Sequence, residues 1–322
     1  MTAVQVASVV IPARNAAATL PRTLEALAAQ DPAPGEVVVV DDGSTDGTVA
    51  LAEGHPIVTR LLRAGPGAGP GAARNAGTAA TAGDVVVFLD SDCFPVAGWL
   101  AAGLRALEHA DLVQGRVDPD PDGERGPFER TLSVPAAYGL FESANLFVRR
   151  TLFDELGGFG DGLSAPAESF AGAVVGEKRL AEDVFFGWAA RRSGARTAFA
   201  DDALVHHAVF PRGPRAFIAE RKRLRYFPAI VREVPELRES FLTHRVFLTP
   251  QSAALVAAAA GVAAARPAGL LAMAPYAHRL YRTARHWPAY PAHRIVAAHL
   301  IADAVGAAAL VRGSLAARTP VL

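Results

Sequence analysis

The sequence predicts an α/β fold with a mostly parallel sheet, and two observations carry that prediction. In the first third, short runs of β-branched residues alternate with segments of helical periodicity, the order of stacked strand-helix-strand units. The chain has 322 residues, 51% of them hydrophobic, which is enough to bury a large core. The expected strands are Ala7–Ile11, Val37–Val40, Ile57–Leu62, Val85–Leu89 and Leu112–Val117, and the expected helices are Leu20–Ala29, Thr48–Glu53, Ala72–Ala82 and Trp99–His109.

Charge and cysteine content exclude several classes of protein. Lys plus Arg (32) equals Asp plus Glu (32), so the total charge does not indicate a nucleic-acid partner. The single cysteine, Cys93, excludes an internal disulfide and a multi-cysteine zinc site, which suits a reducing cytoplasm. The first apolar stretch lacks a basic region and is interrupted by Pro12 and Arg14, so we expect no secretory signal and a cytoplasmic location.

The composition changes near Thr243, where Ala, Leu and Val become dominant. Eight arginines and one acid, Asp303, follow Glu239, which gives this region a charge of about +7. Two apolar helices are expected, at Phe247–Ala265 and Arg294–Val311. They favour a membrane-surface or re-entrant anchor on the anionic cytoplasmic leaflet, and the alternative is a pair of helices buried against the rest of the chain. We expect domains at 1–242, with halves 1–117 and 118–242, and at 243–322.

Two aspartates, Asp41 and Asp42, follow the second expected strand directly and open the motif DDGSTDGT. Ligands of open α/β sheets sit beyond the carboxyl ends of the strands, so these side chains are candidates for binding. Asp46 fits a helix-capping role, which is the structural alternative for the motif. Capping does not explain two carboxylates at a strand end, however, and a carboxylate there can accept a hydrogen bond from a nucleobase or a ribose.

The glycine-rich segment Gly65–Gly77, GPGAGPGAARNAG, lies between an expected strand and a helix. Glycines let the backbone approach a ligand closely, and the helix N-terminus favours a phosphate. Arg74 adds a planar donor for a diphosphate or a base. Within the segment, Gly67–Ala72 resembles a dinucleotide-binding fingerprint with Asp90 at the expected distance, which makes an NAD-dependent oxidoreductase an alternative.

The expected strand Val85–Leu89 runs directly into Asp90-Ser91-Asp92. Two carboxylates one residue apart at the end of a buried strand form a hard-oxygen site for Mn²⁺ or Mg²⁺, and the alternative is a solvated pair that caps a turn. His206, with His207 as the alternative, follows the short strand Ala203–Val205 and is a candidate further metal ligand.

Glu182-Asp183 opens a helical run in which Val184, Phe185 and Trp188 form the expected buried stripe. The two acids suit a helix N-terminus, which is the structural alternative. As a functional residue, the carboxylate would act as a general base on a hydroxyl group. The long loop Ser164–Val175 before this helix is expected to be a lid or a binding loop.

Taken together, VVIPARN, VVVDDGSTDGT, GAARNAG, FLDSD, ANLFVRRTLFDELGGFGD and the later ED resemble glycosyltransferase family 2, over about Ala7–Tyr226. The resemblance implies a GT-A fold, a nucleoside-diphosphate-sugar donor, a divalent cation and inversion at the anomeric carbon. By position, the resemblance implies that Pro12 and Asn15 lie near the nucleoside, that Asp41 or Asp42 contacts the base, and that Arg74 lies near the nucleotide. It implies that Asp90 and Asp92 form the DxD pair, with Asp92 as the direct metal ligand. It implies that Asp183 is the catalytic base.

The expected reaction is therefore the transfer of a sugar from a UDP-sugar to an acceptor hydroxyl, assisted by Mn²⁺ or Mg²⁺. We place Glu182 and Asn145 on the acceptor side, with a lipid-linked or glycan acceptor in view. No QxxRW motif follows Asp183, which favours single or distributive transfer over processive synthesis. A non-catalytic, membrane-peripheral protein that binds nucleotide sugars is the second alternative.

Overall fold

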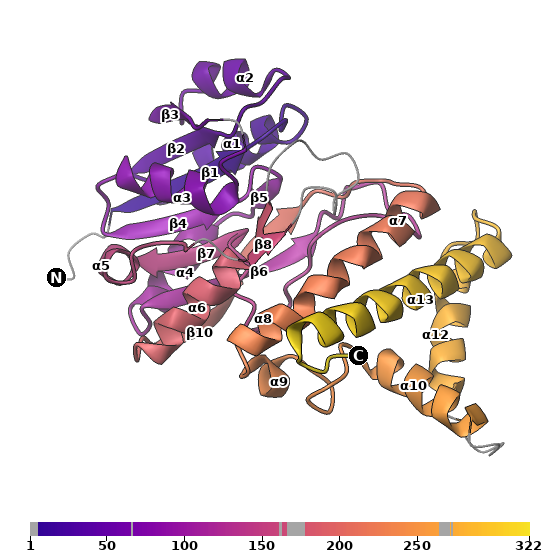
Figure 1. The fold of residues 1–322 in the computed structure, drawn as a ribbon. Coiled ribbons are helices and arrows are strands. Elements are labelled where there is room, and N and C mark those ends of the chain that lie inside the picture. Colours follow the sequence, from indigo (N-terminus) through magenta and orange to yellow (C-terminus); the bar gives the residue numbers. More distant parts are fainter. Residues whose placement is uncertain (1–5, 66, 161–162, 166–177, 264–270, 272) are drawn as a thin grey trace. The chain divides into compact units, whose positions relative to one another are not determined.

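The computed structural model describes residues 6–65, 67–160, 163–165, 178–263, 271 and 273–322 (Figure 1). The chain divides into two compact units. Unit 1 contains Met1–Gly123, Thr131–Ser164 and Val174–Val209, and unit 2 contains Glu124–Arg130, Ala165–Ala173 and Phe210–Leu322. The main break thus follows Val209, earlier than the expected change at 242, because the helices that follow Phe210 pack against the C-terminal helix.

Unit 1 is built on an eight-stranded sheet with the strand order β3-β2-β1-β4-β7-β6-β10-β5. The strands are β1 (Ala7–Ala13), β2 (Glu36–Asp41), β3 (Arg60–Arg63), β4 (Val85–Leu89), β5 (Cys93–Pro95), β6 (Leu112–Pro119), β7 (Asn145–Arg149) and β10 (Thr197–His207). Strands β3, β2, β1 and β4 run parallel, as expected. The sheet becomes mixed beyond them, because β7 is antiparallel to β4 and β6, and β5 is antiparallel to β10.

The helices of unit 1 are α1 (Leu20–Ala28), α2 (Thr48–Gly54), α3 (Pro70–Ala79), α4 (Trp99–Leu107), α5 (Arg150–Glu155) and α6 (Glu182–Arg192). A second, two-stranded sheet pairs β8 (Leu163–Ala165) with β9 (Lys178–Leu180). The first four helices lie where the sequence predicts them, within three residues at each end. The Gly157-Gly158 pair after α5 has φ angles of 74° and 75°, the left-handed conformation in which many helices end.

Helices cover both faces of the sheet, which explains its continuous hydrophobic strands. Val9 and Ile11 of β1 belong to one core cluster together with Leu20 and Leu24 of α1. On the opposite face, α3 packs so closely that a Cβ at Gly77 would lie 2.3 Å from the side chain of Val10. All five residues of β4 are therefore buried, as expected for a strand with both faces covered.

The buried stripe of α6 differs from the prediction. Val184, Phe186 and Trp188 are buried, whereas Phe185 is half-buried. Phe186 packs on the rings of Phe153 and Phe159, with centroids at 5.4 and 5.0 Å. The helix packs on two sides, which a single-stripe pattern does not predict. The expected loop Ser164–Val175 lies, from residue 166 onward, outside the described residues.

Unit 2 is helical. Its elements are α7 (Pro214–Glu220), the 3₁₀ helix η2 (Arg221–Tyr226), α8 (Phe227–Glu233), α9 (Leu237–Ser240), α10 (Pro250–Ala263), α12 (Ala274–His286) and α13 (Ala292–Ala317). The two expected apolar helices correspond to α10 and α13, although residues 264–265 of the first are outside the described part. Helix α13 runs along α7, η2 and α8. The core of this unit includes Phe128, Phe217 and Ile295.

Helix α13 is, within the described residues, the one helix long and apolar enough to cross a membrane. It has 26 residues, and its most apolar stretch has a mean hydropathy of 1.7, with 39% of that stretch buried inside the protein. A buried helix of a soluble protein meets the same criteria of length and composition. These properties alone therefore do not distinguish a membrane helix from a core helix.

Candidate active site

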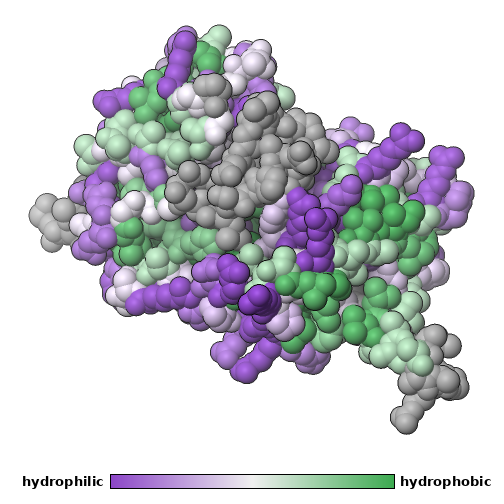
Figure 2. Space-filling view, in the orientation of Figure 1, coloured by the Kyte–Doolittle hydropathy of each residue, from purple (hydrophilic) through white to green (hydrophobic). Residues whose placement is uncertain are grey.

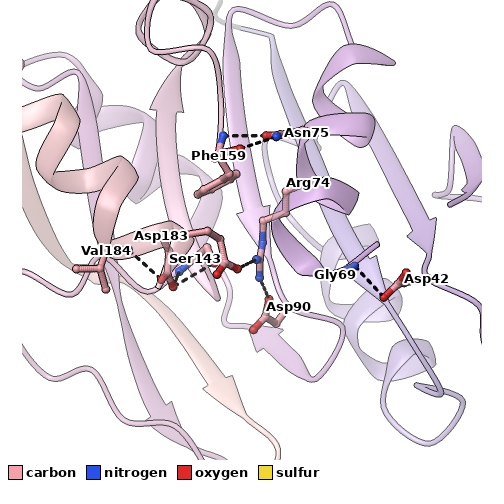
Figure 3. A network of polar contacts seen from close by, with 10 residues as sticks. Asp42, Gly69, Arg74, Asn75, Asp90, Ser143, Phe159, Asp183 and Val184 are labelled. Carbon is pink, nitrogen blue, oxygen red and sulfur yellow. Dashed lines mark hydrogen bonds and ion pairs between the residues drawn. The ribbon is translucent and has the colours of Figure 1, made fainter. Parts of the chain in front are cut away.

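A buried arginine connects the two acidic motifs of unit 1 (Figure 3). Arg74, in the second turn of α3, places one terminal nitrogen 2.6 Å from a carboxylate oxygen of Asp90, and the other 3.5 Å from Glu182. The Arg74 and Glu182 side chains are 5% and 9% exposed, whereas that of Asp90 is 32% exposed. The Nε atom of Arg74 is buried and has no hydrogen-bond partner in the described structure. The DxD motif after β4 and the ED motif at the start of α6 therefore meet at one guanidinium.

A short segment after α5 supports this arginine. Asn75, the neighbour of Arg74, donates from Nδ2 to the backbone carbonyl of Phe159 at 2.8 Å, and its Oδ1 accepts from the Phe159 amide at 2.9 Å. The Arg74 guanidinium lies 5.9 Å from the centroid of the Phe159 ring. Because α3 and the residues after α5 are held together in this way, Arg74 has little freedom to leave the two carboxylates.

The carboxylate of Asp183 is fixed by its neighbours. One oxygen accepts from the backbone N–H and the hydroxyl of Ser143, at 3.3 and 3.4 Å, and the other accepts from the N–H of Val184 at 2.9 Å. Burial raises the pKa of Asp183, while the charge of Arg74 and the amide donors of Ser143 and Val184 oppose that rise. A carboxyl with a raised pKa is a stronger base than an ordinary aspartate, as general-base catalysis requires.

Two further carboxyl groups with raised pKa values lie beside Asp183. Burial, with a further contribution from the charge of Asp183, raises the pKa of Glu182 to about 7, and Arg74 opposes that rise. Burial, again with a contribution from Asp183, raises the pKa of Glu142 to about 7. The sequence interpretation missed Glu142. The available signal was an acid inside the apolar run FESANLF, where a charged side chain is costly to bury.

The DxD motif also faces a histidine. Nε2 of His207 lies 3.6 Å from Oδ1 of Asp92, and Nδ1 of His207 lies 2.7 Å from the carbonyl oxygen of Ala208. Donation from Nδ1 to that carbonyl leaves the Nε2 lone pair directed toward the carboxylate, the orientation typical of a metal-binding imidazole. Carboxylate oxygen and imidazole nitrogen suit Mn²⁺ and also accommodate Mg²⁺. The residues present therefore fit a divalent cation.

Cys93 completes a group with Asp92 and His207 in which one ligand atom from each residue lies within 4.8 Å of the others. Burial, together with the charges of Asp90 and Asp92, raises the pKa of the Cys93 thiol well above its usual range. A neutral thiol is a poor ligand for a hard cation. The carboxylate and the imidazole are therefore the better ligands in this group.

The structure corrects the choice between the two histidines. Strand β10 pairs antiparallel to β5, with His207 opposite Cys93 and His206 opposite Phe94. Successive side chains of a strand point to opposite faces, so only one of the two histidines can face the DxD motif. His207 lies beside Asp92, and the expectation that His206 does so is wrong. His206 lies close to Asp120, whose pKa is lowered mainly by its hydrogen bond to Arg22 and slightly by His206.

The two aspartates at the end of β2, Asp41 and Asp42, hold loops together. The Asp42 carboxylate accepts from the backbone amides of Gly67, Ala68 and Gly69, at 3.1, 2.9 and 3.3 Å. Gly67 and Gly69 have φ angles of 85° and 87°, which glycine adopts without strain. The side chain of Asp41 accepts from the amide of Ser44 at 3.2 Å. The glycine-rich loop thus directs its amides toward Asp42.

The two other residues expected near the nucleoside, Pro12 and Asn15, lie in β1 and two residues after its end. Oδ1 of Asn15 accepts from the Thr45 amide at 2.8 Å, and the Asn15 amide donates to Ser44 Oγ at 2.9 Å, so Asn15 braces the turn after Asp42. Pro12 lies in β1, opposite Val40 of β2. Both residues therefore lie at the same end of the parallel strands as Asp41 and Asp42.

Asn145 does not lie on the acceptor side as expected. Its side chain is fully buried. Oδ1 accepts from the Trp99 indole N–H at 2.9 Å, and Nδ2 donates to the carbonyls of Arg116 and Ala203, at 2.8 and 2.7 Å. These bonds join α4, β6 and β10, so both polar atoms of the Asn145 side chain are used inside the core of unit 1.

Comparison with known proteins finds similarity to glycosyltransferases. Residues 8–162 match the model of glycosyl transferase family 2. The chain is 29% identical over 221 residues to glycosyltransferase AglE of Haloferax volcanii, covering 64% of this chain and 68% of that protein. It is 30% identical over 221 residues to the pre-mycofactocin glycosyltransferase of Mycobacterium tuberculosis, covering 62% of this chain and 42% of that protein. The matched segment therefore spans less than half of the second relative.

Solved structures share the fold. The mannosyltransferase PcManGT of Pyrobaculum calidifontis, solved with GDP-Man and Mn²⁺, aligns with a TM-score of 0.60 and 22% identity, over 95% of this chain and 88% of that chain. TarS of S. aureus, solved with UDP-GlcNAc, aligns with a TM-score of 0.50 and 22% identity, over 73% of each chain. Residues 8–162 of this chain are therefore similar to glycosyl transferase family 2, its related sequences are glycosyltransferases, and it shares the GT-A fold with the solved structures.

Proposed function

We propose that the protein transfers a sugar from a nucleoside diphosphate to an acceptor hydroxyl in one inverting displacement, with Asp183 as the catalytic base. The observation that carries this proposal is the contact of Arg74 with both Asp90 and Glu182. That contact brings the DxD motif and the ED motif to one place. A donor held at the first motif is then within reach of a base at the second.

In the proposed reaction the acceptor oxygen forms a bond to the anomeric carbon while the bond from that carbon to the diphosphate breaks. The acceptor proton moves to the carboxylate of Asp183, and the electron pair of the broken bond leaves with the nucleoside diphosphate. Ser143 and Val184 hold the carboxylate in position through three hydrogen bonds. Because a single displacement inverts the configuration, we expect the product anomer to be opposite to that of the donor.

Negative charge develops on the leaving diphosphate, and Arg74 supplies one positive group beside it. Asp90, Asp92 and His207 are the residues that would hold a divalent cation, which would add positive charge at the same position. The Asp92 and His207 side chains are 21% and 9% exposed. A largely desolvated site of this kind strengthens each electrostatic contact with the diphosphate.

We propose a UDP-sugar as the donor, in line with the UDP-GlcNAc bound by TarS, while the GDP-Man bound by PcManGT makes a GDP-sugar the first alternative to test. The acceptor is a hydroxyl compound of unspecified class, with lipid-linked and glycan acceptors as candidates. The NAD-dependent alternative loses its basis, because the amides of Gly67, Ala68 and Gly69 bind Asp42 of the same chain.

We also propose that unit 2 attaches the enzyme to the inner face of the cytoplasmic membrane. Helix α13 exposes Leu300, Ile301, Val311 and Leu315, with exposed fractions of 44%, 51%, 46% and 76%. Figure 2 shows apolar surface over the helices of unit 2. The arginines of this region complement an anionic leaflet. Co-sedimentation with vesicles that contain phosphatidylglycerol, but not with neutral vesicles, is the expected result.

A screen of nucleotide sugars tests the catalytic proposal. UDP- and GDP-sugars are incubated with the full-length protein, Mn²⁺ and candidate acceptors, and the released nucleoside diphosphate is measured. We expect release from one donor class, stimulated by Mn²⁺ and abolished by EDTA. Nucleotide binding without release, across all donors and acceptors, would favour the non-catalytic alternative. Release that EDTA does not change would contradict the metal-assisted mechanism.

A further inference from the structure

A cavity inside unit 2 has no part in the site described above. Its volume is about 320 Å³, and its walls come from η2, α10, α12, α13 and the C-terminal Leu322. This volume is at the lower end of the range for pockets that bind small molecules. A ligand of this size is a molecule with a single alkyl chain or a small ring.

Polar groups are concentrated at one end of the cavity. Asp303 of α13 accepts from the Tyr276 hydroxyl at 2.8 Å and forms an ion pair with Arg279 of α12. Farther along α13 the lining residues are Gly306, Ala307, Leu310 and Val311, all small or apolar. The seven helical steps from Asp303 to Leu310 span about 10 Å. The cavity therefore has a polar end and an apolar end.

The polar end has a net positive charge, because Arg221 and Arg279 line it together with the single acid Asp303. The guanidinium of Arg221 stacks over the ring of Phe217 at 4.8 Å. Nε of Arg279 is buried, and no hydrogen-bond partner for it occurs in the described part of the chain. Buried donors without a partner are rare in native proteins, so this nitrogen points to an acceptor supplied by a ligand.

The cavity opens onto an apolar surface. Val256 of α10 and Val311 of α13 line it, yet they are 39% and 46% exposed. Leu315, one turn beyond Val311 on the same helix, is 76% exposed. An apolar chain that leaves a bilayer can enter through this rim without crossing a polar surface. The rim therefore favours a membrane lipid over a water-soluble metabolite.

We propose that unit 2 binds a single-chain anionic lipid, with the alkyl chain along α13 and a phosphate head group at Arg279 and Arg221. The cavity volume fits one chain, the two arginines complement the charge, and the apolar rim supplies the route from the membrane. The proposal is independent of glycosyl transfer, since none of these residues belongs to unit 1.

Titration calorimetry with the full-length protein tests this inference. Decyl phosphate, below its critical micelle concentration, is compared with decyl maltoside and with inorganic phosphate. We expect decyl phosphate to bind at least about tenfold more tightly than either comparison compound. Equal binding of decyl maltoside would overturn the role of the arginines, and equal binding of inorganic phosphate would overturn the role of the chain.

Two matched pairs of variants locate the ligand. Ala307→Trp places an indole ring in the cavity from α13. Ala308→Trp adds the same ring at the next exposed position of α13, which does not line the cavity. Arg279→Gln removes a head-group cation, whereas Arg282→Gln removes an exposed cation of the same helix. We expect the first member of each pair to weaken decyl phosphate binding about tenfold or more, and the second to leave it unchanged. Unchanged binding by Ala307→Trp, with native far-ultraviolet circular dichroism, would place any bound lipid elsewhere.

Discussion

Arg74 and Asp90 form a part-buried ion pair, with 2.6 Å between nitrogen and oxygen, at the carboxyl end of the central parallel strands. Replacing Arg74 by Met removes this contact and the positive charge that opposes the raised pKa of Glu182. We expect the KM for the donor to rise and kcat/KM to fall about 10- to 1000-fold. Steady-state kinetics with the donor found by the screen measures both constants. Arg105→Met, at an exposed position of α4, is the control, and equal kinetics of the two variants would contradict the role of Arg74.

The adjacent histidines of β10 provide a matched test of the metal site. His207→Ala removes an imidazole 3.6 Å from Asp92, whereas His206→Ala removes one from the other face of the strand. We expect the Mn²⁺ concentration for half-maximal nucleotide binding to rise about tenfold or more for His207→Ala only. Titration of Mn²⁺ at fixed UDP, followed by calorimetry, gives these values. A larger effect of His206→Ala would show that the metal lies on the other face of β10.

Glu142 links stability to pH. Burial raises its pKa from 4.5 to about 7, so the folded state favours the protonated form. The contribution of Glu142 to the free energy of unfolding is therefore fully present below pH 4.5, and it is lost as the pH rises through about 7. Glu142→Gln avoids the buried charge, and we expect it to stabilise the protein at pH 8 by up to about 3 kcal/mol, with little effect at pH 4.

Urea unfolding at pH 4 and pH 8 measures the effect of Glu142→Gln. Glu124→Gln, which changes an exposed glutamate, is the control. Equal stabilisation at both pH values would show that packing, rather than ionisation, distinguishes the variant.

Asn145 should matter for folding rather than for substrate binding. Asn145→Ala leaves the Trp99 indole N–H and two backbone carbonyls without their partner in the core. We expect the free energy of unfolding to fall by about 2–4 kcal/mol, while the KM values of the remaining folded enzyme stay near those of the wild type. An increased acceptor KM with unchanged stability would restore the acceptor-side role.

The sequence predicts the donor half of the fold well because its signals are local. The end of β4 at Leu89 follows from a buried apolar run that stops at Asp90, and α3 follows from glycine and proline before an alanine-rich segment. The conformation of the Gly157-Gly158 pair also depends on nearby residues alone. Local patterns of this kind determine where an element begins and ends.

The remaining errors concern contacts between distant segments. Whether His206 or His207 faces the DxD motif depends on the register of β10 with β5, a strand of three residues without a periodic signal. The role of Asn145 depends on carbonyl groups from Arg116 and Ala203, which the chain brings together only in the folded sheet. The raised pKa of Glu142 depends on burial, which the identity of a single acidic residue does not reveal.

Replacement of Asp183 by Asn tests the central claim most directly, since the amide has nearly the same size but accepts no proton. Donor binding is measured by calorimetry and transfer by product formation, with Asp154→Asn, an exposed position of α5, as the control. We predict that Asp183→Asn binds the donor with about wild-type affinity and transfers about 10²–10⁴-fold more slowly. Transfer at the wild-type rate by a folded Asp183→Asn protein would contradict the assignment of Asp183 as the base.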